Sequence, residues 1–195
     1  MKHFIFIIII LIISTMTLFS QEEFVRYSEI GLKAGWSPIN NVPMVFRNKH
    51  VVFDNSLLGF RFLHCEQKFG GIIFEANYIK SATTFEGQYY SYDFIQTPLM
   101  THIFFPVKRA SVALNIGSYL QFITDRNSYD IILEKDLLFG MTGGVSFSIP
   151  IKNISFTLEG RYNHNLFSNS NSDYTKLANW FEFSVAACYR KDWNK

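Results

Sequence analysis

The sequence predicts an all-β fold: an eight-stranded, antiparallel, up-and-down transmembrane β-barrel. Three observations support this prediction. Strand-like segments alternate between apolar and polar residues, charged residues in the segment cores keep to one face, and the connections alternate between short and long. An outer-membrane barrel requires all three, because lipid surrounds its outer surface and polar groups fill its interior.

The first residues have the composition of a secretory signal peptide. Lys2 gives a positively charged start, residues 4–13 are apolar, and Ser20 is a small residue suited to cleavage. The alternative is a membrane anchor, which needs about 20 apolar residues, and the run here is shorter. We therefore predict a signal peptide at 1–20 and one barrel domain at 21–195.

Eight later segments have the two-residue period of β-strands, and no segment has the period of a helix. In ISFTLEGRYN, Ile154, Phe156 and Leu158 share one face. Glu159 and Arg161 share the other. The predicted strands cover residues 27–36, 57–66, 69–81, 92–105, 110–124, 137–149, 154–163 and 179–190.

Charged residues within the cores of these strands all lie on the polar face. They are Glu29, Lys33, Arg61, Glu75, Glu159, Arg161, Glu182 and Arg190. A charge that faces lipid at the bilayer midplane costs about 2–4 kcal/mol, so a membrane demands this distribution. Side chains alone can fill an eight-stranded barrel, and unpaired buried charge is costly. We predict that these residues pair in the lumen and close it; the alternative is a conducting pore or proton path.

The predicted connections alternate in length. The long connections are 37–56, 82–91, 125–136 and 164–178, and the short ones are 67–68, 106–109 and 150–153. Outer-membrane barrels have long extracellular loops and short periplasmic turns, whereas a soluble sandwich has no reason to alternate in this way. The main alternative is a soluble, exported, lipocalin-like binding barrel. Its apolar faces would form the interior and its charged faces would meet water.

Two local features refine the strands. Pro98 lies inside the fourth segment, and proline has no N–H for the ladder, so we predict a bulge or local break there. The alternative is that regular pairing begins only at Leu99. Aromatic residues are also expected at the two membrane boundaries. The outer group is Trp36, Tyr78, Trp180 and Phe181, and the inner group is Phe69, Phe105, Phe147, Tyr189 and Trp193.

Composition argues against several functional classes. The 18 Lys and Arg residues nearly balance the 16 Asp and Glu residues and form no basic stripe, so nucleic acid is not an expected partner. Cys65 and Cys188 are the only cysteines, and no Cys/His cluster has the spacing of a zinc site. We predict neither a metal nor a cofactor. The sequence does not decide between a disulfide and two free thiols for these cysteines.

The long connections contain the remaining candidate sites. NHNLFSNSNSDY places His164, Ser168, Ser170 and Asp173 close together in sequence, but this composition is that of any solvated loop. We therefore predict no catalytic residue and no enzymatic activity, with a lipid-modifying enzyme as the alternative. Apolar and aromatic residues at 37–56 and 83–92 favour partner binding by outer loops. Extension of the strands beyond the membrane explains them equally well.

Six stretches resemble the PorT-like outer-membrane β-barrel proteins of Bacteroidetes. They are GLKAG at 31–35, GGIIFEANYIKS at 70–81, YDFIQTPLMTHIFF at 92–105, LNIGSYLQF at 114–122, GMTGGVSFSI at 140–149 and LEGRYNHNL at 158–166. The resemblance implies an outer-membrane location, contact with outer-membrane lipids and insertion by the barrel assembly machinery. It also implies secretion or envelope proteins as candidate partners. The chain departs from the family where KDWNK follows the last strand.

Overall fold

The computed structural model describes residues 25–37, 55–85, 88–107, 109–127, 137–167 and 179–193. The predicted signal peptide and most of the first long connection lie outside these ranges. In the described ranges, no helix is both long enough and apolar enough to cross a membrane.

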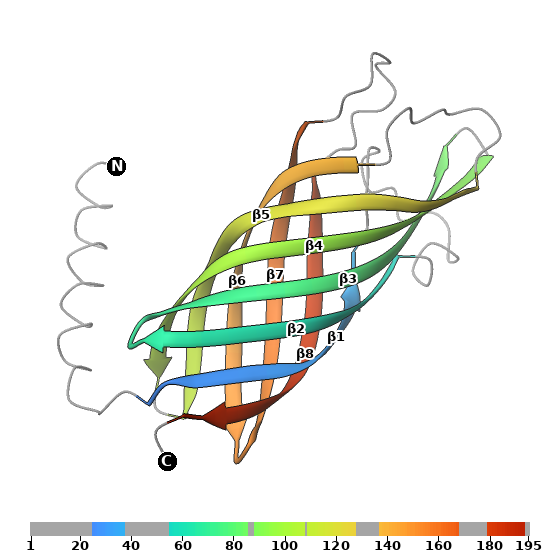
Figure 1. Ribbon diagram of the computed structural model, residues 1–195. Coiled ribbons are helices and arrows are strands. Elements are labelled where there is room, and N and C mark those ends of the chain that lie inside the picture. Colours follow the sequence, from blue (N-terminus) through green and yellow to red (C-terminus); the bar gives the residue numbers. More distant parts are fainter. Residues whose placement is uncertain are drawn as a thin grey trace, which may run out of the picture.

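Eight antiparallel strands form a closed barrel in which each strand pairs with its sequence neighbours and β1 pairs with β8 (Figure 1). The strands are β1 (Tyr27–Trp36), β2 (Ser56–Gln67), β3 (Gly70–Phe85), β4 (Gln88–Val107), β5 (Ala110–Asn127), β6 (Leu137–Ile151), β7 (Ile154–Phe167) and β8 (Trp180–Asp192). The predicted fold class, strand number and strand order are confirmed.

The two ends of the barrel differ. The short connections β2–β3, β4–β5 and β6–β7 lie at one end, together with the start of β1 and the end of β8 (Figure 1). We call this the turn end and the opposite one the loop end. In outer-membrane barrels short turns face the periplasm, which orients the molecule.

The β3–β4 connection is much shorter than predicted. Residues 82–91 were expected to be a loop, but the two strands stay paired as far as Phe85 and Gln88. The hairpin therefore projects beyond the neighbouring strands at the loop end (Figure 1). Strand extension, one of the two alternatives for residues 83–92, is confirmed for this segment.

Pro98 interrupts pairing on one side of β4 only. It lies opposite Tyr119 of β5, and the register with β5 continues through it. On the β3 side the register stops at Leu99 and resumes at Gln96, as expected for a residue without an N–H donor. The predicted local break is confirmed. The alternative, in which regular pairing begins only at Leu99, is wrong, because β4 is paired from Gln88.

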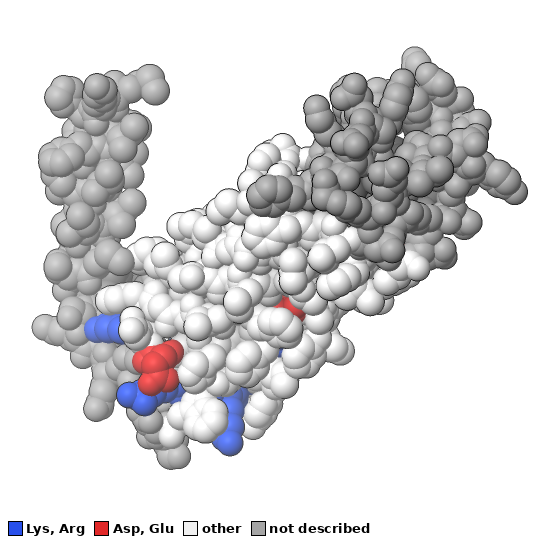
Figure 2. Space-filling view, turned by 45° about the horizontal axis from the view of Figure 1, so that its top comes forward, with Lys and Arg blue, Asp and Glu red and all other residues white. Residues whose placement is uncertain are grey.

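Burial is the reverse of that in a soluble barrel. Outward-facing side chains are apolar and open to the surroundings, with Leu32 72%, Leu58 62% and Leu158 61% exposed. Inward-facing Glu75 and Glu182 are 0% exposed. The visible side of the barrel is largely free of charged side chains, most of which gather at one end (Figure 2). The soluble lipocalin-like alternative is therefore wrong, since its charged faces would meet water.

Candidate functional site

Six ions form a layer across the middle of the lumen, which we call the central ion network. Its members are Lys33 on β1, Arg61 on β2, Glu75 on β3, Glu159 and Arg161 on β7, and Glu182 on β8. None is more than 2% exposed. Strand alternation turns all six inward, and three cations meet three carboxylates, so the layer is electrically balanced.

Glu75 is the most highly bonded carboxylate of the network. Arg161 Nη1 and Nη2 donate to its two oxygens at 2.7 and 2.6 Å, a bidentate geometry. Lys33 Nζ lies 2.9 Å from Glu75 Oε2, and Arg61 Nη1 lies 3.3 Å from Oε1. Asn77 Nδ2 adds a neutral donor at 3.1 Å. All three cations of the layer therefore converge on one carboxylate.

The other two carboxylates complete the network. Glu159 Oε2 accepts from Arg61 Nη1 and Arg161 Nη2, both at 2.7 Å. Glu182 Oε1 accepts from Lys33 Nζ at 2.5 Å. Asn115 Nδ2 donates to the remaining Glu159 oxygen.

Asn115 links the network to further buried polar residues. Its Oδ1 lies 2.7 Å from His102 Nδ1, and its Nδ2 lies 3.2 Å from Ser146 Oγ. Hydrogen bonds thus continue from Glu159 into β4 and β6, which supply none of the six ions.

The remaining two predicted charges form a separate group at the turn end. Arg190 Nη1 lies 4.0 Å from Glu29 Oε1, and Ser155 Oγ donates to Glu29 Oε2 at 2.7 Å. The Arg190 guanidinium also lies 3.6 Å from the centre of the Tyr27 ring and its Nε lies 3.0 Å from Asp192. The structure thus divides the eight predicted lumen residues into a buried group of six and a pair near the rim.

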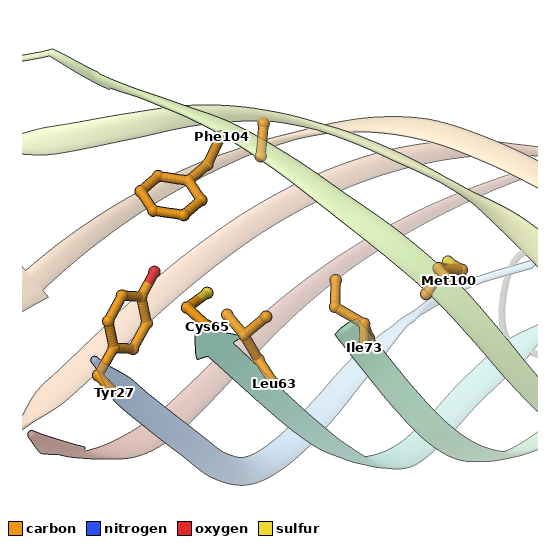
Figure 3. Close-up of a cluster of buried hydrophobic side chains, with 7 residues drawn as sticks. Tyr27, Leu63, Cys65, Ile73, Met100 and Phe104 are labelled. Atoms are coloured by element: carbon orange, nitrogen blue, oxygen red, sulfur yellow. The ribbon is translucent and has the colours of Figure 1, made fainter. Parts of the chain in front are cut away.

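Two apolar clusters inside the lumen lie on either side of the network. The loop-end cluster is Leu57, Ile79, Phe94, Tyr119 and Trp180. The turn-end cluster is Tyr27, Leu63, Cys65, Ile73, Met100, Phe104 and Ala113 (Figure 3). The lumen is therefore layered: apolar, ionic and apolar from one end to the other.

These clusters correct one expectation. Trp180 was assigned to the outer aromatic boundary, but it is 2% exposed and packs edge-on against Tyr119, 5.6 Å between ring centres. Trp180 shares the parity of Glu182, two residues later, so the alternation of the strand already indicated that its side chain points inward. Cys65 and Cys188 are also buried in the lumen, and both are free thiols rather than a disulfide.

Two buried glutamines face the lumen side by side with unsatisfied amides. Gln96 and Gln121 lie opposite one another on β4 and β5, and both are 0% exposed. Within the described residues, neither amide has a hydrogen-bond partner on its nitrogen or its oxygen. An unsatisfied buried polar group costs about 1–3 kcal/mol, so this pair of residues destabilises the interior.

Ser28, His64 and Glu66 are joined on the outer surface near the turn end. Ser28 Oγ lies 2.8 Å from His64 Nδ1, and His64 Nε2 lies 3.1 Å from Glu66 Oε2. This resembles a nucleophile with its base, but hydrolysis also needs free donors for an oxyanion. The backbone of β1 is paired on both sides, and Trp193 Nε1 donates to Ser28 Oγ itself. The Arg26 guanidinium is held by Glu66 at 2.9 Å.

The candidate catalytic group of the last long connection falls mostly outside the described residues. Ser168, Ser170 and Asp173 lie there. His164 is described, and its Nδ1 lies 2.5 Å from Asn179 Oδ1. In the described part of the chain, no group of three or more His, Cys, Asp or Glu residues is arranged to hold a metal ion.

No known protein family and no curated protein matches the sequence. Solved structures do match the fold. A major outer membrane protein from Thermus thermophilus has a TM-score of 0.59 at 12% identity, over 86% of this chain and 100% of that one. The attachment invasion locus protein Ail of Yersinia pestis, in complex with a heparin analogue, has a TM-score of 0.52 at 13% identity, over 86% and 100%. Neisserial surface protein A has a TM-score of 0.51 at 10% identity, over 86% and 97%.

The chain has the fold of an outer-membrane β-barrel. Identities of 10–13% extend the likeness to the fold alone. Its apolar exterior and charged interior are those of an outer-membrane protein, as the sequence predicts.

Proposed function

We propose that the protein is a non-enzymatic outer-membrane barrel that binds partners at its loop end, with a lumen closed by side chains. The partners are envelope or secretion proteins. The barrel anchors in the membrane the loop-end surface to which they bind. The observation that carries the closed lumen is the balanced network of six ions between two apolar clusters.

Closure of the lumen follows from the cost of opening it. An ion that crosses the barrel would have to separate pairs such as Arg161–Glu75, whose atoms approach to 2.6 Å with both side chains buried. Breaking a buried pair leaves an uncompensated charge and costs about 3–5 kcal/mol. The apolar cluster on each side adds a further barrier, because it offers an ion no ligand.

Planar-bilayer recording tests the closed lumen. We expect no steady conductance from the purified protein under conditions in which a porin of known conductance opens in the same bilayer. A steady unitary current from the wild type would contradict the closed lumen and favour a pore.

The projecting β3–β4 hairpin supports partner binding at the loop end. The described part of β2 first pairs with β3 at Ser56, opposite Lys80. Beyond Lys80, residues 81–85 pair with β4 on one side, and their other backbone edge has no pairing strand within the described residues. An open edge of this kind accepts a strand from a partner through main-chain hydrogen bonds.

Crosslinking followed by mass spectrometry tests partner binding. Cells with the wild-type protein are compared with cells whose hairpin is shortened by deletion of residues 82–91. Heat-modifiable migration on a gel controls for folding of the shortened barrel. We expect envelope or secretion proteins to be captured by the wild type and lost with the shortened hairpin. Capture of nothing by the wild type, or of the same proteins by both, would contradict this proposal.

The finer assignment rests on resemblance. We propose that the protein belongs to the PorT-like barrels of Bacteroidetes, is inserted by the barrel assembly machinery and is in contact with outer-membrane lipids. The six resembling stretches supply four of the six network ions, which supports a shared interior. Gene deletion tests this assignment: impaired export of cell-surface proteins would support it, and unchanged export would count against it.

The lack of enzymatic activity is also a proposal. Analysis of lipids from the deletion strain tests it directly. We expect an unchanged lipid profile. A missing modification that the wild type restores and His164→Ala does not would favour the lipid-modifying alternative.

A further inference from the structure

Cations without a counter-ion surround the turn end. Among the described residues, each short turn carries one, Lys68, Arg109 and Lys152, and Lys191 lies at the end of β8. We call these four residues the basic rim. Within the described residues none of them forms an ion pair, whereas the neighbouring Arg26 is paired with Glu66 at 2.9 Å. Charged side chains gather at this end in Figure 2.

The basic rim adjoins the apolar surface that faces lipid. Val107 and Ile151, at the ends of β4 and β6, are 48% and 56% exposed. Lys191 Nζ lies 5.0 Å from the ring centre of Trp193, which is itself 56% exposed. Tryptophan beside a cation at the edge of an apolar band is typical of the headgroup level of a membrane.

The backbone at Lys152 is a second, independent observation. Its φ of 56° is the only positive φ among described non-glycine residues. Tight turns of this hand favour Asn or Gly, because a larger side chain is strained there. The conformation of the turn therefore does not itself favour a lysine at this position.

We propose that the basic rim binds the phosphate groups of anionic phospholipids in the periplasmic leaflet. The four cations lie at headgroup depth and lack carboxylate partners, and a lipid phosphate would neutralise them. Binding at several points around the circumference would also fix the height of the barrel in the membrane. Because this inference concerns the turn end, it is independent of the partner binding proposed at the loop end.

Lipid retention tests the proposal. The full protein is placed in nanodiscs of equal phosphatidylglycerol and phosphatidylcholine, and native mass spectrometry counts the lipids that stay bound after ejection. We expect the wild type to retain phosphatidylglycerol preferentially, with roughly a fivefold loss of preference for each cation removed. The preference should also fall as salt rises. Lys80→Gln is the control, because Lys80 lies on the outer surface near the loop end.

Lys152→Asn separates lipid binding from folding. This substitution relieves the turn, so thermal stability in a zwitterionic detergent should stay the same or rise, while preference for phosphatidylglycerol falls. The combined variant Lys68→Gln, Arg109→Gln, Lys152→Asn and Lys191→Gln should lose the preference entirely. Equal retention of both lipids by the wild type would overturn the proposal and leave an acidic periplasmic protein as the partner of the rim. An equal effect of Lys80→Gln would also overturn it.

Discussion

Arg161 on β7 binds both carboxylate oxygens of Glu75 on β3, at 2.7 and 2.6 Å. The two strands are not neighbours in the sheet, so this pair joins walls that no backbone ladder connects. The lumen of this barrel is therefore a structural element in its own right, and it supplies contacts that the sheet cannot.

Loss of one network cation should strongly destabilise the barrel. Arg161→Met leaves three buried carboxylates with two cations, and we expect a loss of about 3–5 kcal/mol in the free energy of unfolding. Urea titration in detergent, followed by heat-modifiable migration, measures it. Arg26→Met is the matched control, since its pair with Glu66 is exposed and should be worth about 1 kcal/mol or less. Equal losses of unfolding free energy in the two variants would show that an unpaired charge in the network costs no more than one at the surface.

Removal of a cation and an anion together should cost less than removal of the cation alone. Arg161→Met combined with Glu75→Met leaves Lys33 and Arg61 with two glutamates, so charge balance returns. We expect the double variant to be more stable than Arg161→Met, as measured by the same titration. A double variant that loses the sum of the two single effects would contradict charge balance as the organising feature.

The three tryptophans should differ in their contact with lipid. Trp36 stacks on outward-facing Phe183, and Trp193 is exposed, whereas Trp180 lies inside the lumen. In single-tryptophan variants, we expect brominated lipid to quench the fluorescence of Trp36 and Trp193 and to leave Trp180 largely unquenched. Strong quenching of Trp180 would return it to the outer aromatic boundary.

The facing glutamines should be replaceable by apolar residues. Gln96→Leu combined with Gln121→Leu removes amides without partners, and we expect the free energy of unfolding to stay the same or rise by about 1 kcal/mol. Asn115→Leu is the control, because Asn115 donates to Glu159 and its loss should destabilise. If the double glutamine variant loses as much unfolding free energy as Asn115→Leu, the two amides have hydrogen-bond partners in the membrane-inserted protein.

Period-2 alternation allowed the faces of the strands to be predicted well. It placed Glu159 and Arg161 inside and Leu158 outside, because only parity decides which way a side chain points. Parity gives no depth and no lateral partner, however. That Arg161 reaches Glu75 rather than Glu29 depends on the register and tilt of all eight strands, which the sequence of one strand does not contain.

Composition misled where position mattered more. Residues 82–91 were predicted to form a loop, yet ladder pairing continues through much of this segment. Conversely, Trp180 was predicted to lie at the membrane boundary because tryptophan favours that position, although its parity in the strand indicated the lumen. Tyr119 and Ile73 also lay on the polar faces of their segments, and these apolar residues at inward positions were the available signal for the two clusters.

The distribution of the network along the chain bears on how the barrel closes. The first three strands contribute Lys33, Arg61 and Glu75, and the last two contribute Glu159, Arg161 and Glu182. Within the central ion network, the two terminal portions therefore carry opposite net charge, and they meet at the β1–β8 seam, where Lys33 lies 2.5 Å from Glu182. Each portion exposes uncompensated ions until the other arrives. Closure of the seam is thus the step at which the central ion network becomes neutral, so attraction between its ions favours completion of the sheet.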